Sequence, residues 1–168
     1  MSEDSSLHAE KFLREMGVNI LLNKRVIDYR DHKVILEDGT EIATRTFIWV
    51  SGVTGVTIGN MNPSLIGRGG RIKGDQINRV EGMDNVFAIG DQCIQSTDES
   101  YPNGHPQLAQ VAIQQGELLA KNLIRLEKGQ EMKPFHYRNL GSMATVGRNR
   151  AVAEFSKVKM QGWLAWVM

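Results

Sequence analysis

The chain has 168 residues, a length near that of one domain with room for a sizeable core. Hydrophobic residues make up 41% of it and charged residues 23%, a balance that excludes wholesale disorder. Twenty basic and nineteen acidic residues give a formal charge of +1. This argues against nucleic acid as a partner, because an extended nucleic-acid surface shows a marked basic excess. The one cysteine, Cys93, excludes an internal disulfide and any multi-cysteine metal site, and it fits a reducing cytosol.

Neither a membrane-spanning segment nor a signal peptide is visible in the sequence. The chain ends in an apolar and aromatic run over residues 162–168, with no polar residue after it. A complete soluble domain rarely ends in this way, because exposed tryptophans lower solubility. We therefore expect either a piece cut from a longer protein or an end that docks on a partner.

The first fifty residues predict a helix followed by several strands. Apolar spacing over residues 7–16 suits one face of a helix, with Ser6 as its N-cap and Gly17 just past its end. Asp38-Gly39 is a short hairpin signal, because such a turn needs positive φ. The predicted strands are 18–22, 25–29, 33–37, 40–43 and 46–50.

The rest of the chain predicts a glycine-rich connection, a long helix and further short strands. The glycines of residues 54–75 do not lie between a strand and a helix start, so we interpret them as a connection between two globular units rather than a phosphate loop. Pro106 suits the first turn of a helix that runs to about Glu127 and stops near Gly129. The predicted strands are 86–89, 141–146 and 151–155, the last two joined by a turn over 147–149. This order of elements indicates an α/β fold.

The first candidate site is the end of the predicted strand 86–89, which runs into Gly90-Asp91. Open α/β sheets bind ligands at the carboxyl ends of their strands. Gly90 lets a ligand approach the backbone, and Asp91 can accept hydrogen bonds from sugar-type hydroxyls. Because aspartate is frequent in turns, an ordinary structural turn is the alternative interpretation.

The second candidate site is the start of the long helix. Its free N–H groups and the positive end of its dipole stabilise negative charge on a ligand. Gln110 and Gln114 share a face with Ile113, so this side offers both hydrogen bonds and apolar contact. A solvated helix face is the alternative, because glutamine is mostly exposed. An apolar stripe is predicted at Leu108, Ala112, Leu119 and Leu123.

Together, the Gly90-Asp91 pair and the helix string 109–116 resemble the FAD-dependent pyridine nucleotide-disulfide oxidoreductases. Within that superfamily the chain is most similar to the type II NADH dehydrogenases, which pass electrons from NADH through FAD to a membrane quinone. The resemblance extends over residues 7–168. Further matching strings are 46–53, 70–72, 137–148 and 162–166.

The resemblance implies a partial two-dinucleotide-binding-domain fold of the Rossmann-like FAD/NAD(P)-binding type, with a short C-terminal β region. Residues 1–53 would be the C-terminal half of the NADH-binding domain, 54–130 the returning segment of the FAD-binding domain, and 131–168 the start of a quinone- and membrane-facing region. The family's two glycine-rich fingerprints and its membrane-anchoring helices are absent from the sequence. We therefore expect a C-terminal fragment that alone neither holds FAD tightly nor oxidises NADH.

The resemblance also implies a cofactor site for FAD. Gly90 and Asp91 would bind its ribityl or pyrophosphate region. The backbone of Gln110 and Val111, at the helix N-terminus, would face the pyrimidine edge of the flavin and favour its anionic reduced form. No side chain of this chain needs to act as a nucleophile, since the chemistry belongs to the cofactor.

The cosubstrate, the acceptor and the membrane would contact other residues. Gly52 and Val53 would lie near the bound nicotinamide of NADH. Trp163, Leu164 and Trp166 would lead toward the membrane surface, which the parent enzyme would meet from its cytoplasmic side as a peripheral protein. The quinone approach would be lined by Ala109, Gln110, Ile113 and Gln114.

The remaining reactive residues give weaker signals. The four histidines are scattered without metal-ligand spacing, so no metal site is expected. Cys93 has no resolving partner, so we expect a buried or partly buried thiol and no dithiol chemistry. Arg138, Arg148 and Arg150 would form either a small basic patch toward anionic lipid or an ordinary solvated turn.

Two alternative functions stay open from the sequence. The chain could belong to another FAD-dependent NAD(P)H reductase with a soluble acceptor. It could also be a nonenzymatic interaction module, which as a homodimer or a segment-exchanged oligomer would cover exposed sheet edges.

Overall fold

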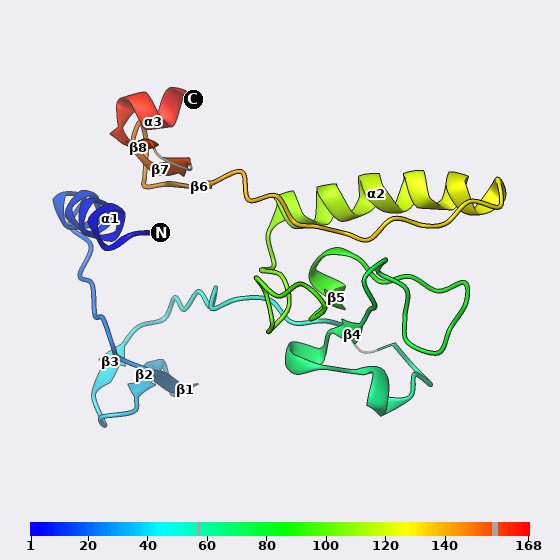
Figure 1. Ribbon diagram of the computed structural model, residues 1–168. Helices are drawn as coiled ribbons and strands as arrows, with labels where there is room; N and C mark the ends of the chain where they lie inside the picture. The colour runs from blue at the N-terminus through cyan, green and yellow to red at the C-terminus, as the bar shows by residue number, and fades with distance from the viewer. Residues whose placement is uncertain (57, 156–157) are drawn as a thin grey trace. The chain divides into compact units, whose positions relative to one another are not determined.

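The computed structural model describes residues 1–56, 58–155 and 158–168 (Figure 1). The chain forms two compact units, one made of residues 1–50 and 140–168 and the other of residues 51–139. In the described part of the chain, no helix combines the length and the apolar character needed to cross a membrane. The expected functional segments 1–53, 54–130 and 131–168 stay a prediction, because the two compact units do not show what each segment binds.

The first unit opens with helix α1 (Glu3–Glu15) and an antiparallel sheet. The sheet has the order β1 (Val26–Arg30), β2 (Lys33–Leu36) and β3 (Glu41–Ala43). Gly39, at φ +83°, lies in the turn between β2 and β3. The hairpin predicted from Asp38-Gly39 is therefore confirmed.

The N-cap of α1 is Ser2, so the prediction of Ser6 was wrong. The helix extends further back because Glu154 holds its first residues. The main-chain amide of Ser2 donates to Oε1 of Glu154 over 2.8 Å, and the hydroxyl of Ser5 donates to the same oxygen over 2.6 Å. Gly17, at φ +81°, follows the end of the helix as predicted.

Two predicted strands of this unit were also wrong. Residues 18–22 and 46–50 form no strand, and large side chains in them are exposed, with Leu22 64% and Val50 85% accessible. An apolar run becomes a strand only where a neighbouring strand pairs with it, and neither run has such a partner in the described residues. Phe47 instead stacks on Tyr29 of β1, with ring centroids 4.8 Å apart.

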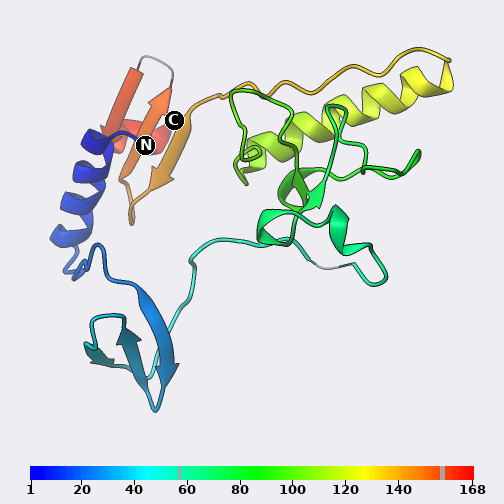
Figure 2. The same ribbon diagram turned by 60° about the horizontal axis from the view of Figure 1, so that its bottom comes forward.

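The C-terminal part of the first unit is a second antiparallel sheet (Figure 2). Its order is β6 (Ser142–Thr145), β7 (Ala151–Phe155) and β8 (Val158–Gly162), and helix α3 (Trp163–Val167) packs on β7 and β8. The predicted turn between β6 and β7 is confirmed by positive φ at Gly147 and Asn149. Neither β8 nor α3 is indicated by the sequence pattern. The small core of this part contains Ala151, Ala153 and Ala165.

The second unit is built around a short parallel pair of strands, β4 (Ile72–Lys73) and β5 (Cys93–Ile94). One buried core cluster of this unit contains Ile72, Val80, Ala88 and Cys93. The predicted strand 86–89 was wrong as an element, because its pairing is limited to single contacts. The amide of Val80 donates to the carbonyl of Val86, and that of Ala88 to the carbonyl of Asn78.

Residues 54–75 belong to this second unit, so their interpretation as a connection between units was wrong. They include two short 3-10 helices, η1 (Pro63–Leu65) and η2 (Arg68–Gly70), and strand β4. The glycines allow close backbone approach: a Cβ on Gly55 would lie 2.3 Å from the carbonyl oxygen of Gly70.

The long helix α2 (Ala109–Glu127) follows β5 and η3 (Gly90–Gln92). It ends at the predicted residue, with Gly129 at φ +65°, but it begins three positions after Pro106. Its buried residues are Val111, Gln115 and Asn122. Two members of the predicted apolar stripe, Leu108 and Leu123, are each 42% exposed, so that stripe is not the face that packs.

Residues 130–139 return along α2, as Figures 1 and 2 show. Buried Asn122 joins the two segments, because its side-chain amide donates to and accepts from the backbone of Lys133, both over 2.8 Å. The side-chain amide of Asn122 thus satisfies backbone groups of the returning segment, as a neighbouring strand would do in a sheet.

Candidate functional site

The two candidate sites predicted from the sequence lie against each other in the second unit. The main-chain amide of Gly90 donates to Oε1 of Gln115 on α2 over 2.7 Å. The side-chain amide of Gln107, just before α2, donates to the carbonyl oxygen of Asp91 over 3.2 Å. These two contacts hold the Gly90-Asp91 turn beside the first turns of the helix.

Close packing between the turn and the helix depends on glycine. Gly90 has φ +62°, in the left-handed region that glycine adopts without strain. A Cβ at this position would lie 3.1 Å from Cβ of Ala112. A larger residue at position 90 would therefore push η3 away from α2.

Asp91 and the start of α2 offer a charged and a dipolar group on neighbouring segments. The carboxylate of Asp91 is exposed. Leu108, the N-cap of α2, has no side-chain acceptor, so the positive end of the helix dipole is not neutralised by a capping side chain. The pair is suited to a ligand that donates hydroxyl groups at one end and carries partial negative charge at the other.

The buried side chain of Arg71 connects two backbone segments next to the Gly90-Asp91 turn. Its Nε donates to the carbonyl of Cys93 over 2.7 Å, and its Nη2 donates to the carbonyl of His105 over 3.0 Å. Burial lowers the pKa of Arg71, and the negative charge of Asp91 acts in the opposite direction. The guanidinium therefore joins β5 to the loop that leads into α2.

The segment after Gly52 and Val53 reaches the same region. Gly52 has φ +107°, and Val53 is 56% exposed. The backbone of Val56, three positions later, donates to Oε1 of Gln92 over 2.8 Å and accepts from Nε2 of that side chain over 2.7 Å. Gln92 directly follows Asp91, so the chain leaving Gly52 and Val53 is tied to the Asp91 turn.

The four residues predicted to line the quinone approach share the first turns of α2. Ala109 and Ile113 are exposed, Ile113 by 60%, while Gln110 and Gln114 are half-buried. Gln114 has a structural role that the sequence does not indicate. Its side-chain amide donates to the carbonyl of Arg138 over 2.9 Å and accepts from the amide of Arg138 over 3.0 Å.

The remaining candidates from the sequence have ordinary structural surroundings. Cys93 is 1% exposed, and burial raises the pKa of its thiol, which confirms the expected buried thiol. Arg150 pairs with Glu15 over 2.6 Å and lies over the ring of Phe12. Among the residues that the structure describes, no three metal-ligating side chains gather at one place.

The feature that sequence reasoning missed is a buried cluster around His105. The imidazole is 1% exposed, and its Nε2 lies 3.1 Å from Oδ2 of Asp98. Its ring neighbours are Tyr101, Phe135 and Tyr137. The only sequence signal is the placing of Tyr101 and His105 in the loop before the helix, which alone does not distinguish a core residue from a surface one.

Known proteins match this chain over most or nearly all of its length. Residues 1–116 match the family model described as pyridine nucleotide-disulphide oxidoreductase. The chain is 33% identical to the type II NADH:quinone oxidoreductase NdhA of Mycobacterium tuberculosis, over 99% of this chain and 37% of that protein. It is 35% identical to the mitochondrial internal alternative NAD(P)H-ubiquinone oxidoreductase A1 of Arabidopsis thaliana, over 95% of this chain and 34% of that protein. The chain thus spans little more than a third of the length of these relatives.

Solved structures agree on the fold. The structure of NDH2 from Plasmodium falciparum in complex with NADH superposes with a TM-score of 0.84 at 17% identity, covering 98% of this chain and 50% of that chain. The sulfide:quinone oxidoreductase of Aquifex aeolicus superposes with a TM-score of 0.67 at 14% identity, covering 97% and 42%. The α/β fold and the superfamily resemblance expected from the sequence are confirmed. The chain belongs to the pyridine nucleotide-disulphide oxidoreductase family.

Proposed function

We propose that this chain is part of an NADH:quinone oxidoreductase that passes electrons from NADH through FAD to a membrane quinone. The observation that carries the proposal is the contact between the Gly90-Asp91 turn and the start of α2. The relatives named as quinone oxidoreductases, which match nearly the whole chain, support it.

The residues present fit one side of an FAD site. The exposed carboxylate of Asp91 suits the hydroxyls of the ribityl chain, which donate hydrogen bonds, better than the like-charged pyrophosphate region. Gly90 keeps the turn close to α2, so that the carboxylate and the helix tip serve one ligand. When bound, FAD supplies the hydride and electron transfer chemistry.

The N-terminus of α2 would act on the flavin by electrostatics. The backbone of Gln110 and Val111 lies in the first turn, where the helix dipole favours negative charge. Val111 is only 2% exposed, so its side chain packs this first turn against the rest of the second unit. The helix tip would therefore stabilise negative charge on the pyrimidine edge without having to reorganise.

The two substrates would approach this site along different segments. Gly52 and Val53 would lie near the nicotinamide of NADH, because the following residues are tied to Gln92. The quinone would pass Ala109, Gln110, Ile113 and Gln114 on α2. Ala109 and Ile113 offer exposed apolar surface to a quinone ring, whereas the amide of Gln114 already holds the backbone of Arg138.

The C-terminal residues support a peripheral position at a membrane surface, which the parent enzyme would meet from its cytoplasmic side. Trp163, Leu164 and Trp166 are 60%, 64% and 41% exposed. Tryptophan favours the interface between lipid and water, so these side chains suit contact with a membrane surface. A self-associated arrangement, as a homodimer or by segment exchange, is the competing use of such exposed apolar residues. Light scattering in the presence and absence of lipid vesicles separates the two.

A chimeric enzyme tests the proposed function. The type II NADH:quinone oxidoreductase of Staphylococcus aureus is 31% identical to this chain over 90% of it. Replacing the matching region of that enzyme with this chain should give a protein that binds flavin and reduces a water-soluble quinone with NADH. A chimera that binds flavin and reduces ferricyanide but no quinone would contradict the quinone assignment. One that folds without flavin would contradict the cofactor assignment.

A further inference from the structure

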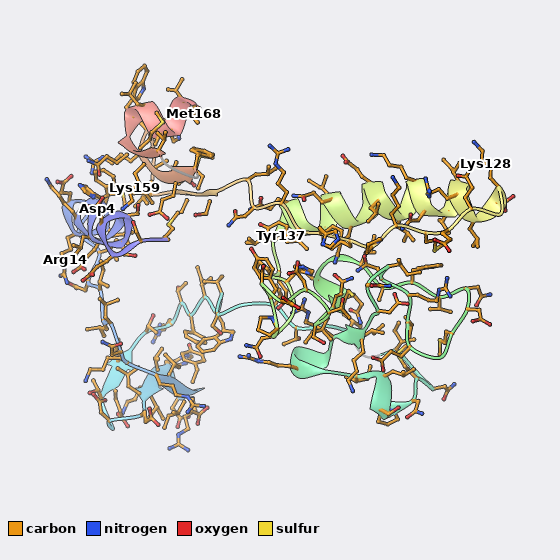
Figure 3. All side chains as sticks on the ribbon, viewed as in Figure 1. Asp4, Arg14, Lys128, Tyr137, Lys159 and Met168 are labelled. Atoms are coloured by element: carbon orange, nitrogen blue, oxygen red, sulfur yellow. The ribbon has the colours of Figure 1, made fainter. Side chains whose placement is uncertain are left out.

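His105 is the centre of an aromatic cluster in the second unit. Its ring centroid lies 5.1 Å from that of Tyr101, 5.2 Å from that of Phe135 and 5.8 Å from that of Tyr137. Tyr101 comes from the loop before α2, and the other two come from the segment that returns along the helix. Figure 3 places Tyr137 near the start of α2 and Lys128 near its end. The cluster therefore lies beside the first turns of the helix, the part used by the proposed site.

The hydrogen bonds of His105 define its tautomer. The bond from His105 lowers the pKa of Asp98, so this carboxylate is ionised at neutral pH and can only accept. Nε2 of His105 must then carry a proton, which it donates over 3.1 Å. Nδ1 is buried and has no partner in the described residues. A second proton there would be a buried donor with no acceptor among the described residues, so the geometry favours the tautomer with its proton on Nε2 and a bare Nδ1.

The backbone of His105 is held as firmly as its side chain. Its carbonyl accepts from Nη2 of Arg71, and Nε of the same arginine donates to the carbonyl of Cys93. Cys93 follows η3 directly, so one guanidinium joins the end of the Gly90–Gln92 turn to the residue four positions before α2. Both parts of His105 are thus held in place: Asp98 binds the imidazole ring, and Arg71 binds the main-chain carbonyl.

We propose that His105 is a positioning residue: its neutral imidazole, held by Asp98, orders the loop over residues 98–108 so that α2 begins beside Asp91. It acts through the loop and touches no substrate. The ordering of the loop is independent of any ligand. Only the consequence for FAD, that the ordered loop keeps the start of α2 at the FAD site, rests on the proposed function.

The first test reads the tautomer directly. In the 168-residue chain at pH 7, nitrogen chemical shifts of the His105 ring should show a protonated Nε2 and an unprotonated Nδ1. His136, an exposed neighbour in the same unit, serves as the reference ring. A doubly protonated His105, or one protonated at Nδ1 alone, overturns the proposal. This readout needs no variant, so it stands even if a substitution at His105 prevents folding.

The second test reads the start of the helix by hydrogen exchange without flavin. In His105→Ala the main-chain amides of residues 111–115 should exchange about tenfold faster, because a hydrogen bond to a charged group is lost, while those of residues 123–127 stay unchanged. His105→Gln should restore slow exchange, since its side-chain amide can donate to Asp98. Asp98→Ala should reproduce the His105→Ala result, and the double variant should add nothing further.

Two controls keep the outcome specific. Tyr137→Phe retains the ring and removes a hydroxyl that is buried without a partner among the described residues, so exchange should not change. His136→Gln should also leave it unchanged. Faster exchange along the whole helix, or additive effects of His105→Ala and Asp98→Ala, overturns the positioning role. If exchange behaves as expected but FAD does not bind at the Asp91 turn, the proposed function fails while the role of His105 stands.

Discussion

The main-chain amide of Gly90 and the side-chain oxygen of Gln115 are 2.7 Å apart, and Gln115 is only 2% exposed. The buried side-chain amide of Gln115, on the second turn of α2, therefore accepts a hydrogen bond from the backbone of the Gly90-Asp91 turn, which lies far from it in the sequence. This contact, together with the bonds of Asn122 to the backbone of Lys133, explains why the buried face of α2 contains glutamine and asparagine instead of the leucines that its periodicity suggests. It also fixes where Asp91 stands relative to the helix tip.

Replacing Gln115 with alanine should destabilise the second unit by about 1–3 kcal/mol, because the half-buried amide of Gly90 loses its acceptor. Cys93 reports this unit alone, since it is the one thiol of the chain and is buried there. Its rate of reaction with a thiol reagent across a urea series gives the free energy of unfolding. Gln130→Ala, at an exposed position, should change that free energy by less than about 0.5 kcal/mol. Similar losses in both variants would mean that the Gly90 contact has no special weight.

Gly90→Ala should cost more stability than Gly82→Ala. Both glycines have positive φ, which costs an alanine roughly 1–2 kcal/mol. A Cβ at Gly82 would meet no atom of the described residues within 4 Å, whereas one at Gly90 would meet Ala112 at 3.1 Å. The crowding should add about 1–3 kcal/mol in Gly90→Ala alone. The rate at which the Cys93 thiol reacts gives the free energy of unfolding of both variants. Equal losses of this free energy would show that the Gly90-Asp91 turn and α2 are not in close contact.

Short-range signals in the sequence predicted part of this fold correctly. The hairpin at Gly39, the turn with Gly147 and Asn149, and the end of α2 before Gly129 all depend on residues that adopt positive φ. Such residues act through their own backbone, so the sequence is enough to locate them. The runs 18–22 and 46–50 failed for the opposite reason. Their apolar composition fits a strand, but pairing depends on a distant partner that composition does not reveal.

The candidate site divides in the same way. The Gly90-Asp91 turn and the helix start were predicted because each is a continuous motif whose resemblance to a family is recognisable. The contacts that hold them together were not predicted. Arg71 reaches the carbonyls of Cys93 and His105, and Gln92 pairs with Val56, across separations that leave no local pattern. Side chains that bond to distant backbone groups become visible only once the chain is folded.

The first unit should lose stability in acid through Glu154. Hydrogen bonds from the hydroxyls of Ser2 and Ser5 and from the amide of Ser2 hold the pKa of Glu154 at about 2, below its ordinary value of 4.5. A lowered pKa in the folded state stabilises the fold above the ordinary value, so this contribution is present above about pH 4.5 and is lost as the pH falls toward 2.

Tryptophan fluorescence measures this effect, because all three tryptophans lie in the first unit. In Glu154→Gln the unfolding midpoint should depend less on pH between 4.5 and 2 than in the unsubstituted chain. Glu3→Gln, at the exposed start of the same helix, should keep the full pH dependence. An unaltered pH profile in Glu154→Gln would show that this carboxylate does not anchor α1.

Gln110→Ala should separate the two half-reactions of the chimeric enzyme. Gln110 lies in the first turn of α2 with the exposed apolar side chains of Ala109 and Ile113 beside it. Loss of its amide should slow electron transfer to quinone by about tenfold, the weight of one hydrogen bond, and leave flavin reduction by NADH nearly unchanged. Stopped-flow measurement of each half-reaction checks this, with Gln130→Ala as the matched control. Equal slowing of both half-reactions would remove the proposed role of Gln110 at the quinone.

The central claim is that Asp91 and the tip of α2 form one side of a flavin site, and a titration of the 168-residue chain with FAD followed by NMR tests it most directly. The account predicts weak binding, with shift changes confined to residues 90–92 and 109–111. Asp91→Ala should weaken binding by about tenfold or more, while Asp84→Ala, at another exposed carboxylate of the same unit, should bind as before. Shift changes elsewhere in the unit, or equal weakening in the two variants, would contradict the assignment.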